Sequence, residues 1–211
     1  MDQRLAARFS LFDTSIVSDA LDEFGIDGVI TGIEPADPGH TVAGRATTVA
    51  FEPAAGDEET NFPYAMLEAM APNRVLVLDG IDPDVSCWGG RASELAANAE
   101  VAGVVVDGGF RDVGEIRGGS LPVFGRRPTP RTGQRRMRVD AVGEPVTIDG
   151  VTIEPETVVV ADATGIVVVP PSHIGDVLER AEEILGEELV LERKIDRGAT
   201  VSDLKTDDHA F

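Results

Sequence analysis

Two apolar runs joined by a helix-forming segment constrain the fold of this chain more than any other feature. The runs are 74–80 (RVLVLDG) and 102–106 (AGVVV), and the segment 91–100 between them is rich in Ala, Leu and Glu, which favour helix. A continuous apolar run of this length is typical of a strand buried on both faces, and a helix between two such strands favours parallel pairing. The sequence therefore predicts an α/β fold that contains a parallel strand–helix–strand unit.

The rest of the chain continues this alternation. We expect strands at 41–51, 74–78, 102–107, 122–126, 135–143, 145–153, 158–162 and 165–169, the last two joined as a hairpin around 163–164. We expect helices from Asp13 or Thr14 to a stop at Gly25, at 61–71, at 91–100, as a turn at 112–117, and from Pro171 and Ser172 onward. No repeat or linker divides the chain, so we predict one domain over 1–198 with layered β/β/α packing and a mixed sheet. The polar tail 199–211 is expected to be mobile.

The charge balance is strongly acidic, with 38 Asp and Glu against 18 Lys and Arg and a formal net charge of −20. Such a chain repels nucleic acid on average, so we expect no nucleic-acid partner. Only 2 of the 18 basic residues are lysines, a bias that resembles proteins of halophilic archaea, and we expect such a source. One cysteine excludes an intrachain disulfide. Because the chain shows neither a signal core nor an apolar run of the roughly 20 residues that span a bilayer, we expect a cytoplasmic protein without a membrane partner.

The segment 88–112 (WGGRASELAANAEVAGVVVDGGFRD) places glycines and charged residues around the strand–helix–strand unit. Gly89 and Gly90 precede the predicted helix, whose first amide N–H groups lack partners within the helix and can bind a carboxylate or a phosphate. Arg111 and Asp112 follow the second strand, at the carboxyl end where ligands bind in open α/β sheets. Arginine offers a planar fork for a carboxylate, and aspartate offers a hard oxygen ligand for Mg²⁺ or Mn²⁺. This layout predicts a site for a small anion and a metal.

This segment resembles, without a gap, the signature of the RraA-like family, which includes the 4-hydroxy-4-methyl-2-oxoglutarate aldolases: WGE, an Ala-rich helix, and then GVAGVV, DG and RD in order. Four further blocks resemble the family in the family's order: 13–25 (DTSIVSDALDEFG), 32–49 (GIEPADPGHTVAGRATTV), 121–130 (LPVFGRRPTP) and 158–170 (VVVADATGIVVVP). The resemblance covers most of the chain. It implies a swivelling-domain-like, RraA-like fold and a homo-oligomer, in which ring-shaped trimers sometimes stack into hexamers.

The resemblance also implies roles for the glycine turn. In the aldolases, four residues that open this turn bind the pyruvyl part of the substrate, largely through backbone amides. They correspond here to Gly89, Gly90, Arg91 and Ala92. One departure is visible, because the family often has Glu where this chain has Gly90.

Three other positions take roles from the same resemblance. Arg111 corresponds to the arginine that binds the substrate carboxylate, and Asp112 to the aspartate that holds a divalent cation. A glutamate that reaches in from a neighbouring subunit assists the site. Its spacing from the rest of the motif favours Glu187, with Glu188 and Glu192 as alternatives.

For the release of pyruvate that the resemblance implies, the residue types favour a metal over an imine. Release of pyruvate by retro-aldol cleavage or by decarboxylation of oxaloacetate passes through an enolate, whose charge needs a metal or a protonated imine. An imine needs a lysine, and the only two, Lys194 and Lys205, lie beyond the sheet pattern. Zinc is not indicated, because the one cysteine, Cys87, and the three histidines show no ligand spacing. We therefore expect Mg²⁺ or Mn²⁺, a small 2-oxo acid substrate, and a water activated by the metal or by a glutamate as the base.

The residues leave several alternatives open. A regulator of the same family, named for inhibition of an RNA-degrading endonuclease, would bind a protein partner instead of catalysing a reaction. A quinone methyltransferase is disfavoured, because the chain has no glycine-rich cofactor loop with an acidic partner. Cys87 and Trp88 are interpreted as packing residues, and Asp107 and Asp162 as structural residues or further ligands. The arginines at 126, 127, 131, 135, 136 and 138 are expected to pair with carboxylates of a neighbouring subunit rather than with RNA, and the loops 52–62 and 128–133 to shape specificity.

Overall fold

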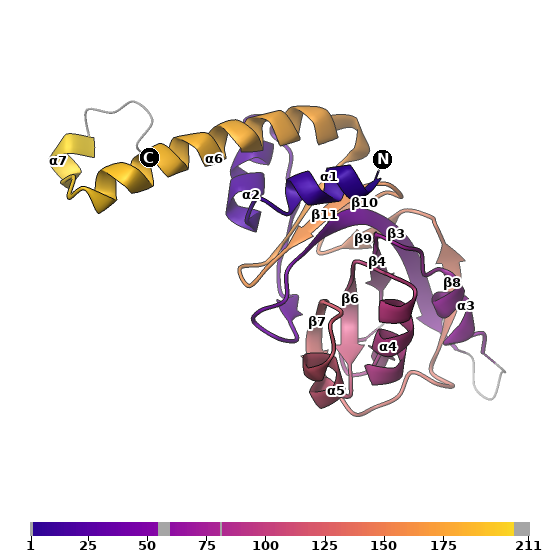
Figure 1. Ribbon diagram of the computed structural model, residues 1–211. Coiled ribbons are helices and arrows are strands. Elements are labelled where there is room, and N and C mark those ends of the chain that lie inside the picture. The colour runs from indigo at the N-terminus through magenta and orange to yellow at the C-terminus, as the bar shows by residue number, and fades with distance from the viewer. Residues whose placement is uncertain (1, 55–59, 81, 205–211) are drawn as a thin grey trace.

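A mixed sheet with the strand order β1-β12-β11-β3-β4-β6-β7-β2 forms the centre of the molecule (Figure 1). The computed structural model describes residues 2–54, 60–80 and 82–204. The strands of the sheet are β1 (Val29–Ile30), β2 (Glu34–Pro35), β3 (Val42–Pro53), β4 (Arg74–Asp79), β5 (Ser86–Trp88), β6 (Gly103–Phe110), β7 (Val123–Pro128), β8 (Met137–Val142), β11 (Val158–Ala161) and β12 (Ile166–Val169). β5 pairs with β6 and β8 with β3, and β9 (Val146–Ile148) and β10 (Val151–Ile153) form a separate hairpin. The helices are α1 (Asp2–Phe9), α2 (Thr14–Glu23), α3 (Tyr64–Glu68), α4 (Gly90–Asn98), α5 (Val113–Gly118), α6 (Ile174–Asp196) and α7 (Val201–Leu204), with a 3-10 turn at Pro171–His173.

The parallel unit predicted from the two apolar runs is confirmed. β4 pairs in parallel with β3 and β6, and β6 pairs in parallel with β5 and β7. Successive residues of β4 alternate between two cores, with Leu76 and Leu78 in one cluster and Val75 and Val77 in the other. Because both faces of these strands are covered, every position in the runs can be apolar.

Helices and strands cover the two faces of the sheet in layers (Figure 1). α3, α4 and α5 pack on one face, where Met66, Ala96 and Ile116 join the cluster around β4 and β6. The β9–β10 hairpin packs on the opposite face through side chains that include Ile148 and Ile153. α1, α2 and α6 cover the part of the sheet formed by β11 and β12. The arrangement confirms the predicted α/β fold with a mixed sheet and layered packing.

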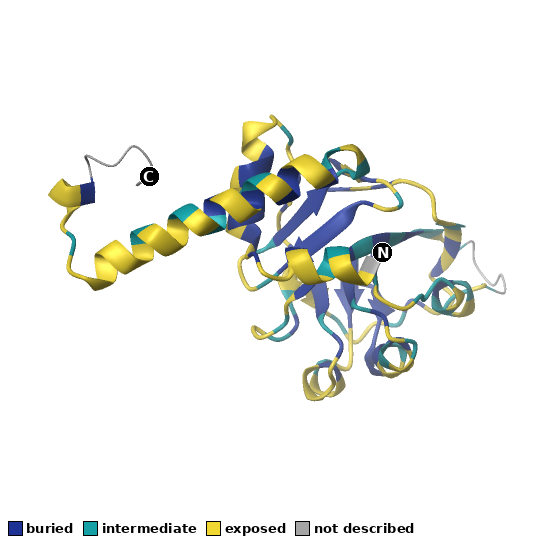
Figure 2. Ribbon diagram, turned by 45° about the horizontal axis from the view of Figure 1, so that its top comes forward, coloured by how far each residue is buried: buried dark blue, intermediate teal, exposed yellow. Residues whose placement is uncertain are grey.

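Only the first half of α6 packs against the body of the protein. Its buried residues are Ile174, Val177, Leu178, Ala181 and Ile184. In the second half, the apolar side chains of Leu189, Val190 and Ile195 are between 43% and 51% exposed. Figure 2 shows this half as an arm that projects from the body, with exposed residues along most of its length. No helix in the described part of the chain is both long enough and apolar enough to cross a membrane.

The structure differs from the sequence-based expectations in several places. The segment 145–153 is a hairpin rather than one strand, because Asp149 and Gly150, with φ of 52° and 82°, form a tight two-residue turn. The helix expected at 61–71 is limited to α3, and α1, β1, β2 and β5 were not predicted. The tail expected to be mobile forms α7, in which Leu204 is buried, while residues 205–211 lie outside the described residues, and its mobility stays a prediction.

Candidate active site

β5 and β6 bring the two halves of the motif together. These parallel strands end at the same edge of the sheet, with Trp88 paired with Phe110, and the N–H of Arg111 donates to the carbonyl oxygen of Trp88 over 3.0 Å. The chain continues from β5 through Gly89 into α4, and from β6 through Arg111 and Asp112 into α5. The glycine turn and the Arg–Asp pair, which are far apart in sequence, are therefore neighbours in space.

Asp112 is fixed by its backbone and by two polar neighbours. Its φ of 57° and ψ of 41° place it in the left-handed region, which costs a residue with a side chain about 1–2 kcal/mol. Its Oδ2 accepts a hydrogen bond from the N–H of Gly90 at 3.2 Å and lies 3.5 Å from Nε of Arg111. Within the described part of the chain, Oδ1 accepts no hydrogen bond. The carboxylate is 38% exposed, so one of its oxygens can take a further ligand.

A cavity of about 820 Å³ opens beside these residues. Five of the predicted site residues lie on its wall: Gly89, Arg91, Ala92, Arg111 and Asp112. The remaining wall comes from α3 and the residues just before it, from β5, from Leu95 of α4, and from Thr132, Gln134 and Arg135 before β8. Both loops expected to shape specificity thus contribute described residues to the wall, while 55–59 lie outside the described residues. Gly90 and Glu187 are not part of the wall.

The N-terminus of α4 supplies amides at this wall. The helix begins at Gly90, and the first hydrogen bond that closes it runs from the N–H of Ser93 to the carbonyl of Gly89 at 3.0 Å. The N–H groups of Arg91 and Ala92 therefore have no partner within the helix. A Cβ on Gly89 would lie 2.8 Å from Oδ2 of Asp112, so a side chain there would displace this carboxylate. The half-exposed guanidinium of Arg111 lies beside Asp112. Together with this guanidinium, the amides favour the binding of a carboxylate.

Glu115, which the sequence reasoning did not single out, lies against the glycine turn but is not part of the cavity wall. It lies one helical turn after Asp112, in α5, and its side chain occupies the space that a side chain at position 90 would fill. A Cβ built on Gly90 would overlap the carboxylate of Glu115 and lie 2.8 Å from its Cδ. This chain thus places a carboxylate from the neighbouring helix where the resembling sequences often have Glu. The signal in the sequence is Gly90 in place of that Glu, combined with a Glu three residues after Asp112.

Glu187 lies on α6, and within one chain it does not meet the other predicted site residues. Its Oε1 accepts a hydrogen bond from Arg180 at 3.2 Å, and Arg180 also binds Glu23 at 2.7 Å and Glu183 at 3.1 Å. These interactions, the one with Glu23 first, raise the pKa of Arg180. A role for Glu187 at the cavity therefore requires a second copy of the chain.

Cys87 and Trp88 are packing residues beside the site, as predicted. Cys87 is 1% exposed, and burial raises the pKa of its thiol to about 12, so the thiolate needed for nucleophilic attack does not form at neutral pH. Trp88 is 2% exposed, and its Nε1 donates to Oγ of Ser93 over 2.8 Å. Ser93 in turn donates to the carbonyl oxygen of Gly89 over 3.1 Å. This chain of hydrogen bonds ties the glycine turn to the core.

Asp107 and Asp162 have structural roles and do not line the cavity. Asp107 accepts a hydrogen bond from Arg126 at 2.6 Å. Asp162 accepts hydrogen bonds from Thr14 and Thr164, which join the β11–β12 turn to the start of α2. Burial raises the pKa of Asp162, but these hydrogen bonds outweigh it and the net shift is downward.

Three arginines of the arginine-rich segment have ion-pair partners within one chain, and the expected pairing with a neighbouring subunit stays a prediction. These arginines bind carboxylates of the same chain, in the pairs Arg126 with Asp107, Arg127 with Asp84, and Arg138 with Glu52. The acidic composition explains the result, because a carboxylate of the same chain lies within reach of each of these guanidinium groups.

The donor set suits a hard divalent cation held by few protein ligands. Among the described residues, no group of three or more His, Cys, Asp or Glu side chains is arranged to hold a metal ion. A site made of side chains alone is therefore not indicated there. Mg²⁺, however, is commonly bound through one or two carboxylates, with water and substrate oxygens as the other ligands. Asp112 fits this pattern, and Glu115 lies against the glycine whose amide binds Asp112.

Fold and site together define an α/β protein with a cavity, lined by both charged and apolar side chains, at the carboxyl edge of its parallel strands. A family model described as RraA-like, Aldolase/RraA, matches residues 14–168, and the chain belongs to this family. It is 30% identical over 192 residues to a Halalkalibacterium halodurans protein with the provisional name 4-hydroxy-4-methyl-2-oxoglutarate aldolase; the match covers 89% of this chain and 87% of that protein.

Two further similarities place the chain within the family. It is 30% identical over 194 residues to protein DlpA of Legionella pneumophila, a match that covers 90% of this chain but only 31% of DlpA. The crystal structure of RraAS2 from Streptomyces coelicolor, described as an unusual member of the RNase ES inhibitor RraA family, superposes with a TM-score of 0.80 at 28% identity. That superposition covers 94% of this chain and 98% of RraAS2.

Proposed function

We propose that this protein is a divalent-metal-dependent lyase that releases pyruvate from 4-hydroxy-2-oxo dicarboxylic acids such as 4-hydroxy-4-methyl-2-oxoglutarate, from oxaloacetate, or from both. The observation that carries the proposal is the pair Arg111 and Asp112, held beside the unpaired amides of α4 on one cavity wall. The provisional aldolase name of the Halalkalibacterium relative supports the same class of reaction.

Each residue on this wall has a distinct task in the proposed reaction. The carboxylate of the pyruvyl end binds the amides of Arg91 and Ala92, with the guanidinium of Arg111 beside it. Asp112 holds Mg²⁺ or Mn²⁺ through the oxygen that has no hydrogen bond among the described residues. Gly90 contributes to the site through its amide, which orients the carboxylate of Asp112.

The cleavage step needs positive charge where Arg111 lies. Rupture of the bond between C3 and C4 leaves its electron pair on the pyruvyl fragment as an enolate, while the other fragment leaves as a carbonyl compound. Arg111 stabilises the negative charge that grows on the pyruvyl fragment. A bound divalent cation supplies Lewis-acid stabilisation of the same charge. We assign Glu115, which lies against the glycine turn outside the cavity wall, to accept the proton of the 4-hydroxyl group through a water molecule and to return it to C3 of the enolate, which completes pyruvate.

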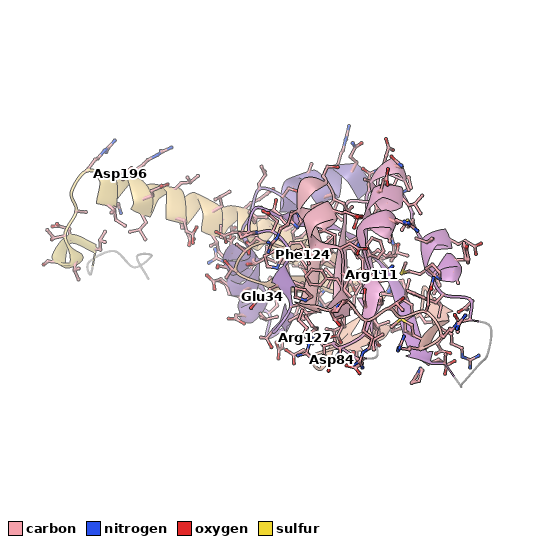
Figure 3. All side chains as sticks on the ribbon, turned by 90° about the horizontal axis from the view of Figure 1, so that it is seen from below. Glu34, Asp84, Arg111, Phe124, Arg127 and Asp196 are labelled. Carbon is pink, nitrogen blue, oxygen red and sulfur yellow. The ribbon has the colours of Figure 1, made fainter. Side chains whose placement is uncertain are left out.

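The test is pyruvate release from 4-hydroxy-4-methyl-2-oxoglutarate and from oxaloacetate, in high potassium chloride with Mg²⁺ or Mn²⁺, with the spontaneous decay of oxaloacetate subtracted. Arg111→Ala and Asp112→Asn should each lower the rate about a hundredfold or more. The matched controls are Arg127→Ala and Asp84→Asn, which break an exposed Arg–Asp pair outside the cavity (Figure 3) and should keep the wild-type rate. Turnover that persists in a chelator or in Asp112→Asn contradicts the metal-dependent mechanism.

We further propose that the active form is a homo-oligomer in which Glu187 reaches the cavity of a neighbouring subunit. The exposed apolar side chains on the projecting half of α6 support such an assembly. The single variants Asp112→Asn and Glu187→Gln should each be inactive. A mixture of the two should regain activity, because some sites then combine an intact Asp112 from one subunit with an intact Glu187 from another. Subunit exchange is checked by native mass spectrometry. Exchange without recovery contradicts the cross-subunit role.

Regulation of a ribonuclease by protein binding is a second candidate function. It is favoured by the similarity to RraAS2, which is described as a member of an RNase inhibitor family. Its test is inhibition of an RNase of the same class by the folded protein. Inhibition that persists in Asp112→Asn, with no pyruvate released by the metal-loaded wild type, would favour this function over the lyase.

A further inference from the structure

The cavity carries more positive charge than the proposed cleavage uses. Among the described residues, three arginines line it, Arg91, Arg111 and Arg135, against one carboxylate, that of Asp112. Arg111 lies beside Asp112. Among the described residues, the guanidinium groups of Arg91 and Arg135 have no hydrogen-bond or ion-pair partner. Both arginines are exposed, so their side chains are free to turn toward a ligand in the cavity.

The backbone around Arg135 is anchored on β5. The N–H of Ser86 donates to the carbonyl oxygen of Arg131 over 2.8 Å, and the N–H of Gly133 donates to the carbonyl oxygen of Ser86 over 2.9 Å. Met137, two residues after Arg135, is 1% exposed and fixes the other end of the segment. Arg135 itself has a φ of 63°, which is uncommon for a long side chain and persists only with such support. The structure thus fixes the backbone of Arg135 beside the cavity, while its side chain is exposed.

The anchor of Arg135 and the proposed pyruvyl site lie at the two ends of β5. Ser86 begins this strand and Gly89 follows its last residue, a span of about 10 Å at roughly 3.3 Å per residue. The same cavity exposes the apolar side chains of Tyr64 and Leu95, which are 73% and 50% exposed. The wall therefore combines two cationic positions with an apolar surface, which matches an aliphatic chain with a carboxylate at each end.

We propose that Arg135 binds the second carboxylate of the substrate, at the end remote from the pyruvyl group, and so selects 2-oxo dicarboxylic acids over 2-oxo monocarboxylic acids. The proposal rests on the proposed function for its choice of substrate. The planar fork of a guanidinium suits a carboxylate. A substrate with a methyl group in place of that carboxylate leaves the arginine unmatched and is bound less tightly.

The test compares two ligands that differ only at the remote end, 2-oxoglutarate and 2-oxopentanoate, by titration calorimetry with Mg²⁺ present. The wild type should bind 2-oxoglutarate about 10- to 100-fold more tightly. Arg135→Gln should abolish this preference and leave the affinity for 2-oxopentanoate unchanged. Arg135→Gly, which relieves the backbone at a φ of 63°, should do the same, so that a misfolded loop cannot explain the loss. Arg131→Gln, on the same segment but outside the cavity wall, is the matched control and should keep the preference.

Pyruvate release by the same variants separates this proposal from the proposed function. A protein that releases pyruvate but keeps its preference for 2-oxoglutarate in Arg135→Gln overturns the role of Arg135 and leaves the lyase intact. A preference that depends on Arg135, in a protein that releases no pyruvate, supports the carboxylate subsite and overturns the lyase. A wild type that binds both ligands equally also overturns the role of Arg135.

Discussion

The hydrogen bonds from Trp88 through Ser93 to Gly89 allow a quantitative prediction about how the glycine turn is held. Both side chains are buried, with exposed fractions of 2% and 8%. Ser93→Ala leaves the indole N–H of Trp88 without its acceptor, which should lower the free energy of unfolding by about 1–3 kcal/mol. For a chain of this length, each kcal/mol corresponds to a fall in Tm of about 2–4 °C. Trp88→Phe loses the same hydrogen bond and leaves a small cavity, so its cost should be larger, about 2–4 kcal/mol.

The two substitutions share one hydrogen bond, so their effects should not add. The double variant should be less destabilised than the sum of the single variants by about 1 kcal/mol. Urea unfolding should be followed by far-UV circular dichroism rather than by fluorescence, because Trp88 is the only tryptophan and Trp88→Phe removes it. All variants should be compared at one protein concentration, because association of subunits would make the stability depend on concentration. Ser120→Ala, an exposed serine, is the control and should change stability by less than about 0.5 kcal/mol. A Ser93→Ala effect as small as that of the control, or full additivity, refutes the reasoning.

Two further predictions follow from the titratable groups near the site strands. Burial, and then the negative charge of Asp107, raise the pKa of Asp79, so ionised Asp79 opposes folding at neutral pH. Asp79→Asn should therefore raise the free energy of unfolding at pH 7. This gain should shrink as the pH falls, because wild-type Asp79 then becomes protonated. Urea titrations that give an equal gain at pH 4 and pH 7 contradict this prediction. Burial raises the pKa of Cys87 to about 12, so iodoacetamide at pH 8 should label the thiol in urea but not in the native protein. Mass spectrometry measures the labelling. Rapid labelling of the native protein would contradict this prediction.

Elements with a strong local pattern could be predicted from the sequence. β4 and β6 are apolar because both faces are covered, and α4 is rich in helix-forming residues, so Arg111 and Asp112 were correctly placed at the end of a buried strand. β5 has only three residues, and its strand character depends on pairing with β6, so no periodicity reveals it. The β9–β10 hairpin was missed although its signal is local, because Asp149-Gly150 is a dipeptide that favours a tight turn between strands.

The sequence predicted those site residues that lie next to a recognisable strand or helix. The turn residues and the Arg–Asp pair lie on segments that the sequence orders correctly, and parallel pairing of β5 with β6 brings them together. The lack of a partner for Arg135 among the described residues could not be predicted, because pairing depends on where the carboxylates of distant segments lie. Neighbouring arginines such as Arg127 and Arg138 find partners, and nothing in the local sequence distinguishes Arg135 from them.

The contact between Gly90 and Glu115 also joins segments that are distant in sequence, and it can be tested by substitution. The left-handed turn at Asp112 and the parallel pairing of β5 with β6 set the starts of α4 and α5 side by side, so the side chain of Glu115 fills the space above Gly90. A side chain at position 90 would therefore displace the side chain of Glu115 from its present place. Gly90→Glu alone should place two carboxylates in one space and lower both Tm and the rate of pyruvate release.

The double variant Gly90→Glu with Glu115→Gly should recover much of both losses, because it moves one carboxylate from α5 to α4 without crowding. Glu115→Gly alone should keep the fold but lose the carboxylate. Its rate of pyruvate release should therefore be lower than that of the wild type, while its Tm remains near that of the wild type. Melting curves and pyruvate release on the four proteins separate these effects. Independent effects of the two substitutions on Tm would show that the side chains do not share one space, and the placement of Glu115 as the proton acceptor would then fail.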